Sequence, residues 1–219
     1  LNSHDKTTKN FEVCFWNING KLCSINEDLT ELLAKNNKFD MFCFTETWHE
    51  SRPIPIPAAL TDSYVHVDSL AIRDSSLGRA SGGILLFIQK NLMKSYTVID
   101  ISNLWILIRI NLPGTVLVVG SFYLSPAIDD VIALEMVHGV LTDLVGSMPS
   151  NTVWLLGGDW NSRIGLAGDL ERDLTAGACI GERRLSLDRT VNRRGRLFTE
   201  LCEEFGLIVC NGRSDAPHL

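Results

Sequence analysis

Residues 153–161 read VWLLGGDWN: four apolar residues, two glycines, and then an aspartate and an asparagine on either side of a tryptophan. A short apolar run of this kind predicts a buried strand. The two glycines let a backbone or a ligand approach closely. A buried strand that runs into Gly-Gly-Asp-x-Asn makes a poor loop. The pattern therefore indicates that both polar side chains have a function. Asp159 can orient or deprotonate a water, and Asn161 can donate to a phosphate oxygen.

Two more polar residues follow apolar strands in the same way. Asn17 comes after the run 13–16, and Glu46 comes after the run 41–45. If these strands and the strand before Asp159 end at one edge, an amide and two carboxylates converge there, a set that suits a hard divalent cation such as Mg²⁺. The alternative is that Asn17 and Asp159 are ordinary turn residues and Glu46 is a solvent-exposed strand end.

The remaining pattern mixes strands with helices. Further strands are predicted at 64–67, 83–89, 96–99, 104–110, 116–123 and 207–210. Pro113-Gly114 predicts a hairpin between two of them, and Ser125-Pro126 predicts a helix start. Other helices are predicted around 22–33 and 197–205. The simplest packing is two sheets face to face with helices covering the outside.

Composition narrows the class of protein. The chain has 219 residues, 45% of them hydrophobic and 21% charged, which excludes a disordered chain and favours one compact domain. Its apolar runs are far shorter than the roughly 20 residues that cross a bilayer, and no leader is evident, so neither membrane insertion nor secretion is predicted. Six cysteines without a CxxC pair predict core thiols in a reducing compartment. The formal charge of −6 does not favour nucleic-acid binding, although a carboxylate metal site is itself acidic.

Four motifs occur in an order that resembles the endonuclease/exonuclease/phosphatase superfamily. They are WNING at 16–20, TETW at 45–48, SFY at 121–123 and GGDWNSRIG at 157–165. In detail they look like the apurinic-endonuclease-like domain of non-LTR (LINE-type) retrotransposons. The later Asn192-x-x-Gly195 and Asn211-Gly212-Arg213 are also similar to that branch. The resemblance runs from about Phe11 to Arg213, so we expect one domain over 1–213 and a tail over 214–219.

The resemblance implies a fold and a role for each residue. The fold would be an α/β, four-layer α/β/β/α sandwich of two mostly antiparallel sheets (DNase I-like). Glu46 would be the main metal ligand, with Asn17 beside it orienting a bound water or the scissile phosphate. Tyr123 would hydrogen-bond the phosphate, Asp159 would activate the attacking water, and Asn161 would stabilise charge on the phosphoryl oxygens.

The implied reaction is hydrolysis of one DNA strand with Mg²⁺, or alternatively Mn²⁺, as the cofactor. The implied partners are DNA and the reverse transcriptase domain of the same polyprotein, which extends the 3′-hydroxyl that the nuclease leaves. The expected location is nuclear or cytoplasmic.

The end of the chain departs from the superfamily pattern. The superfamily completes its site with a Ser-Asp-His motif, whereas here Ser214-Asp215 is followed by Ala216. The strands that normally follow the last recognisable one are absent. We therefore expect a second sheet without its last strands, impaired nicking and a tendency to associate. The alternatives are a catalytically inactive remnant that binds DNA or protein, and another phosphodiesterase of the same superfamily.

Arginines gather before and within the last predicted helix. The candidates for contact with the DNA backbone are Arg183, Arg184, Arg193 and Arg194. The alternative is a solvated charged face on which these arginines pair with neighbouring acids.

Overall fold

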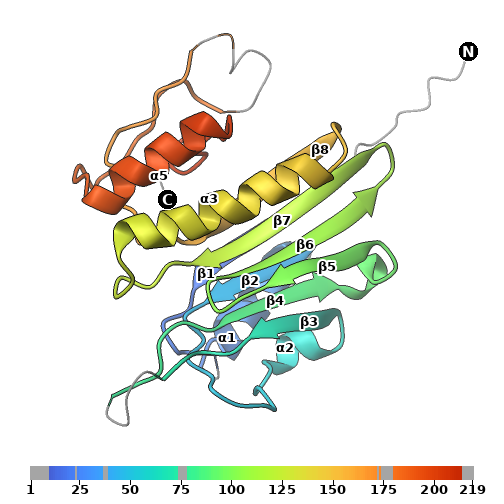
Figure 1. Ribbon diagram of the computed structural model, residues 1–219. Helices are drawn as coiled ribbons and strands as arrows, with labels where there is room; N and C mark the ends of the chain where they lie inside the picture. Colours follow the sequence, from blue (N-terminus) through green and yellow to red (C-terminus); the bar gives the residue numbers. More distant parts are fainter. Residues whose placement is uncertain are drawn as a thin grey trace, which may run out of the picture. The chain divides into compact units, whose positions relative to one another are not determined.

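The computed structural model describes residues 10–22, 24–36, 39–73, 78–171, 173 and 180–213 (Figure 1). The predicted tail 214–219 lies outside these ranges, as do Cys23 and Cys179. The chain divides into two compact units, residues 1–125 with 149–160 and residues 126–148 with 161–219. None of the described helices is long and apolar enough to cross a membrane.

The first unit holds all eight strands described, in two mixed sheets of four. The first sheet has the order β1-β2-β4-β3, and its strands are β1 (Val13–Asn17), β2 (Met41–Thr45), β3 (Tyr64–Ser69) and β4 (Ile84–Gln89). The second has the order β5-β6-β7-β8, and its strands are β5 (Tyr96–Ile101), β6 (Trp105–Leu112), β7 (Thr115–Tyr123) and β8 (Thr152–Asp159). Only the pairs β1–β2 and β7–β8 are parallel. The predicted hairpin at Pro113-Gly114 is confirmed, because Leu112 pairs with Thr115.

Alternate residues of both sheets form the core between them, as the period of two along a strand requires. The first sheet contributes Met41, Cys43, Ile84, Leu86 and Ile88, and the second contributes Ile106, Ile108, Ile110, Leu117, Val119 and Tyr123. Cys43 is a core thiol as predicted, and burial, with Cys14 nearby, raises its pKa so that it stays protonated. Cys210 was also expected in the core, but it is exposed.

The other face of the first sheet is covered by two helices, α1 (Asn26–Asn36) and α2 (Ala58–Thr61), which Figure 1 shows on the same side of it. Leu29 of α1 and Leu60 of α2 pack with the rings of Phe42, Phe44 and Phe87. A short 3-10 helix, η1 (Lys90–Leu92), follows β4. The first unit therefore contains three layers in the order helix, sheet, sheet, which confirms the α/β architecture.

The second unit is built on two packed helices, α3 (Asp130–Ser147) and α5 (Arg193–Glu204). His138 of α3 lies 2.8 Å from a carboxylate oxygen of Glu204 and packs its ring on Phe205. The structure begins α3 later than the predicted Ser125-Pro126, because Asp129 caps the helix and accepts from the backbone N–H groups of Val131 and Ile132.

The predicted last strand, 207–210, is wrong: these residues are irregular. Their backbone groups bond locally, not to a neighbouring strand. The carbonyl of Val209 accepts from Arg213 Nε at 2.7 Å, and the N–H of Leu207 donates to the Cys202 carbonyl at 2.8 Å. An apolar run is stabilised as a β-strand only where a neighbouring strand can form backbone hydrogen bonds with it.

Candidate active site

Strand register brings the predicted polar residues to one end of the first unit. In the first sheet Asn17 is level with Thr45, and in the second Tyr123 is level with Asp159. Asn17 is two residues beyond Phe15, and Asp159 is four beyond Leu155, both of which pack in the core between the sheets. By the period of two, Asn17 and Asp159 point into the same space.

Asn17 and Asp159 meet across that space. Asn17 Nδ2 donates to Asp159 Oδ2 at 2.8 Å, although the two residues are 142 positions apart in sequence. The other end of the amide is also fixed, because Asn17 Oδ1 accepts from the backbone N–H of Asn19 at 3.0 Å. Asn17 is therefore oriented with its donor toward the carboxylate, and it holds that carboxylate in place.

The close approach of β1 and β8 depends on Gly157. A Cβ at this position would lie 2.6 Å from carbons of the Phe15 ring, which is closer than real Cβ contacts come. Gly157 is therefore needed because its backbone packs against Phe15 of β1, which belongs to the other sheet. Gly158 has φ 110°, and a Cβ there would lie 2.1 Å from the Phe122 carbonyl oxygen.

Glu46 follows β2 in a left-handed conformation, with φ 55°. Non-glycine residues adopt this conformation at a cost of about 1–3 kcal/mol, and such strain gathers at functional sites. Backbone bonds hold the turn: the Glu46 carbonyl accepts from Gly20 at 2.7 Å, Thr47 donates to Gly83 at 3.2 Å, and Trp48 donates to Gly82 at 3.1 Å. The strained residue is the predicted metal ligand.

Tyr123 is buried at the end of β7, with its hydroxyl 3.5 Å from Ser81 Oγ. Burial raises the pKa of its phenol, and the nearby charges of Glu46 and Asp159 raise it further, while the contact with Ser81 acts in the opposite direction. The phenol therefore keeps its proton and can donate it in a hydrogen bond.

Asn161 begins the second unit and is also left-handed, with φ 49°. Its carbonyl accepts from Asn192 Nδ2 at 3.3 Å. The residue before it, Trp160, stacks on Phe122 with the ring centroids 4.4 Å apart. Asn161 is therefore held by Asn192 within the second unit, and Trp160, the residue before it, is held by Phe122 within the first unit.

The sequence profile of the Endonuclease/Exonuclease/phosphatase family matches residues 14–199, a range that includes every residue of the candidate site. The chain belongs to this family. A search of curated protein sequences finds no match.

Solved structures support the family fold. The endonuclease domain of TRAS1, a telomere-specific non-LTR retrotransposon, is similar with a TM-score of 0.55 and 15% identity, over 95% of this chain and 76% of that domain. The AP endonuclease LMAP from Leishmania major is similar with a TM-score of 0.55 and 14% identity, over 88% of this chain and 66% of that protein. At this identity they show the DNase I-like fold alone.

The donor set of this family member suits a hard cation. Glu46, Asp159 and Asn17 offer carboxylate and amide oxygens, with no thiolate or imidazole among them. Mg²⁺ is held by one or two protein carboxylates and keeps several waters. Among the residues that the structure describes, no group of three or more His, Cys, Asp or Glu is placed to hold a metal. The oxygen donors of Glu46, Asp159 and Asn17 are of the kind that a hard divalent cation takes.

For two of the four arginines, burial contradicts the predicted contact with DNA. The first is Arg184, which is 5% exposed. Its guanidinium donates to the carbonyls of Asn211 at 2.8 Å, Ala167 at 2.8 Å and Gly165 at 3.2 Å. Burial, with Arg213 nearby, lowers its pKa. Arg184 thus ties together the loops of the second unit.

The second correction is Arg194, which is 2% exposed. It pairs with Asp130 of α3 at 2.8 Å and donates to the Ile128 carbonyl at 2.6 Å, so it joins α5 to the start of α3. Arg183 and Arg193 are exposed, and Arg193 lies 3.7 Å from Asp129. DNA contact therefore stays a prediction for Arg183 and Arg193 alone.

Asn192, part of the Asn192-x-x-Gly195 motif, has a structural role. Asn192 caps α5, because its Oδ1 accepts from Gly195 at 2.6 Å and from the backbone N–H of Arg163 at 3.1 Å. A Cβ at Gly195 would lie 2.0 Å from the Arg163 carbonyl oxygen. This role could have been predicted from the sequence, because asparagine is a preferred N-cap residue at the start of a helix. Ser81 was missed outright, because its contact with Tyr123 is visible only in space.

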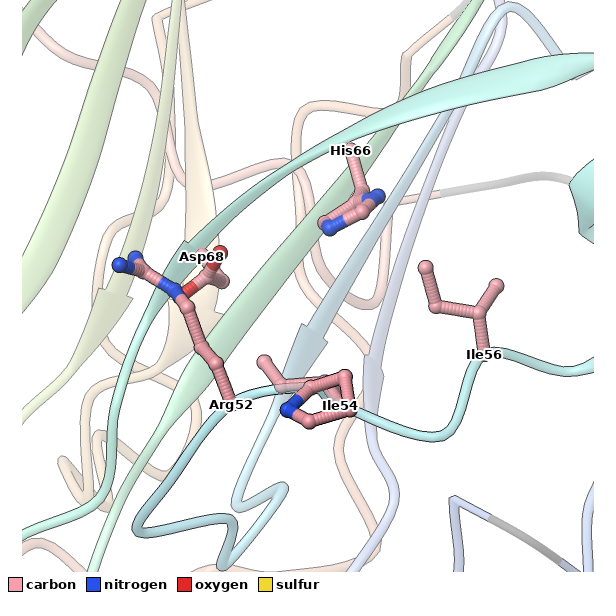
Figure 2. Close-up of a pocket in the computed structure, with 6 residues that line it drawn as sticks. Arg52, Ile54, Ile56, His66 and Asp68 are labelled. Carbon is pink, nitrogen blue, oxygen red and sulfur yellow. The ribbon is translucent and has the colours of Figure 1, made fainter.

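A separate cavity of about 560 Å³ lies elsewhere on the first unit (Figure 2). Arg52, Ile54, Ile56, His66 and Asp68 line it, and Arg52 pairs with Asp68 at 2.7 Å. His66 and Asp68 belong to β3, which is at the edge of the first sheet opposite β1. This cavity is therefore not the candidate active site.

Proposed function

We propose that this chain is a divalent-metal-dependent phosphodiesterase that nicks one strand of DNA. The observation that carries the proposal is the hydrogen bond from Asn17 to Asp159 across the two sheets, beside Tyr123 and Glu46. In this proposal Asp159 is a general base, Tyr123 is a hydrogen-bond donor and Glu46 is a second carboxylate, all within the first unit.

Asp159 is the proposed general base. A carboxylate that accepts a proton from water as it attacks phosphorus must be held in a fixed orientation. Asn17 supplies that orientation by donating to Oδ2, and Asn19 in turn fixes the amide of Asn17. Asn17 is thus a positioning residue in this proposal.

Tyr123 is the proposed donor to a non-bridging phosphate oxygen. Its raised pKa keeps the phenol neutral, and the neutral form carries the proton that such an oxygen accepts. Asn161 has the same proposed role through its amide. Glu46, with Asp159, would hold Mg²⁺ or Mn²⁺, which when bound supplies positive charge against the charge that develops on the phosphate.

DNA as the substrate, and a retrotransposon as the source, are proposed from the motifs and the family. The four motifs lie in regions that the family profile covers, and the TRAS1 domain, itself an endonuclease, shares the fold. By the same resemblance we propose that residues 1–213 act as one domain and that its partner is a reverse transcriptase domain of the same polyprotein.

The test is nicking of a supercoiled plasmid in single-turnover conditions, with protein in excess. We expect conversion to nicked circles in Mg²⁺ or Mn²⁺ and none when EDTA removes the metal. Excess protein is used so that the observed rate reports a single cleavage event. Plasmid that is bound but uncut with and without metal would favour an inactive remnant. Cleavage of phosphoinositides with intact plasmid would favour another phosphodiesterase.

A further inference from the structure

A stacked pair of side chains lies beside the candidate site and has no role in the mechanism above. The guanidinium carbon of Arg79 lies 3.9 Å from the centroid of the Trp48 ring. Arg79 is exposed and Trp48 is half-buried. A planar guanidinium on an aromatic face is held by cation–π attraction while its N–H groups at the edge stay available to a ligand.

The tryptophan ring is fixed in place. A Cβ at Gly20 would lie 1.8 Å from Cε3 of Trp48, so the ring fills the space that this glycine leaves open. Gly20 in turn donates to the Glu46 carbonyl at 2.7 Å. Trp48 has φ 57°, and its own N–H donates to Gly82. The ring is therefore tied to the turn that presents Glu46.

The loop that carries Arg79 is also anchored. Ile72 and Ser81 exchange backbone hydrogen bonds of 3.0 and 2.8 Å across its base. Arg73 forms a two-pronged pair with Glu50, both contacts at 2.6 Å, and donates to the Gly78 carbonyl, the residue before Arg79. The residue before Arg79 is therefore held by a side chain that is itself fixed.

The pair is connected to the site on both sides. Trp48 is two residues after Glu46, and Arg79 is two residues before Ser81, whose hydroxyl lies 3.5 Å from that of Tyr123. Across the described part of the chain, no carboxylate is in ion-pair distance of Arg79. An exposed cation held at this position, in a chain of net charge −6, suits an anionic ligand.

We propose that Arg79, held over the Trp48 ring, binds a backbone phosphate of the DNA strand next to the one that is cut. This deepens the proposed function and depends on it. The guanidinium fork matches two phosphate oxygens, and its fixed position sets where the neighbouring phosphate lies relative to Tyr123 and Asp159.

The experiment measures DNA binding and nicking for Arg79→Ala, Arg79→Lys and a matched control, Lys94→Ala. Lys94 is exposed and follows the far end of β4, the end opposite to the one at the site. Binding of a labelled duplex is followed by fluorescence anisotropy in EDTA over a range of salt concentrations. Nicking is followed on supercoiled plasmid in Mg²⁺.

For Arg79→Ala we expect affinity and nicking each to fall about 10-fold, and the slope of log affinity against log salt to shrink by about 0.9, the share of one phosphate. Arg79→Lys should keep the salt slope but lose part of the nicking rate, because lysine does not stack as a plane. Lys94→Ala should match the wild type.

Two results overturn the proposal in different ways. If the wild type nicks plasmid and Arg79→Ala binds and nicks equally well, Arg79 is not a phosphate contact, while the proposed function stands. An equal loss in Lys94→Ala has the same meaning, because the effect then reflects net charge. If the wild type neither binds nor nicks DNA, the proposed function fails, and this inference fails with it.

Discussion

Replacing Asp159 with asparagine is expected to slow plasmid nicking by about 10³-fold, within the range of losses seen when a general base is removed. The change keeps the shape of the side chain, and its amide oxygen still accepts from Asn17 Nδ2, so the packing of β1 and β8 is preserved. What is lost is the ability to take a proton from water, together with one charged oxygen that would hold the cation. The rate is measured in single-turnover conditions in Mg²⁺.

The matched control is Asp143→Asn, which removes one exposed carboxylate from α3. It should nick at the wild-type rate. Thermal melts should show that both variants are folded. Nicking by Asp159→Asn within a few-fold of the wild type would contradict the role of Asp159 as base, whatever its effect on stability.

Gly157→Ala is expected to destabilise the first unit by about 1–3 kcal/mol, the usual cost of forcing an extra carbon into a packed core. The new Cβ would meet the Phe15 ring at 2.6 Å, and that partly buried ring packs against the core between the sheets. Relief requires β1 and β8 to separate, which also lengthens the contact from Asn17 to Asp159. Nicking should therefore fall together with stability.

The control and the rescue both come from this chain. Gly139→Ala, in α3, places a Cβ with nothing within 4 Å, and it should be neutral or stabilise the chain by about 0.5–1 kcal/mol. Phe15→Leu removes part of the obstructing ring, so the double variant Gly157→Ala/Phe15→Leu should recover part of the loss. Denaturant unfolding measures each free energy. Additive effects of the two changes would show that the ring is not what Gly157 avoids.

Much of the site could be predicted because it depends on strand ends. The apolar runs before Asn17, Glu46 and Asp159 predicted three strands, and all three are present. The period of two then decides which side chains face the core, so the contact between Asn17 and Asp159 follows from local pattern plus two packed sheets. The two-sheet architecture was predictable for the same reason.

Contacts that depend on loops could not be predicted. The approach of Ser81 to Tyr123 and the stack of Arg79 on Trp48 join segments that only the folded chain brings together. In the sequence Arg184 and Arg194 look like surface charges. Nothing near them in the chain reveals the backbone carbonyls that accept from Arg184 or the carboxylate that pairs with Arg194. A run of arginines in a sequence therefore does not show which of them are exposed, because the folded chain can use guanidinium groups to hold loops together.

The most direct test of the central claim, that Glu46 and Asp159 share one cation site, is a Mn²⁺ titration followed by electron paramagnetic resonance, which does not depend on catalysis. The account predicts a single Mn²⁺ bound by the wild type, displaced by excess Mg²⁺. It predicts at least about 10-fold weaker binding for both Glu46→Ala and Asp159→Asn, and no change for Asp143→Asn. Wild-type Mn²⁺ affinity in both site variants would contradict it.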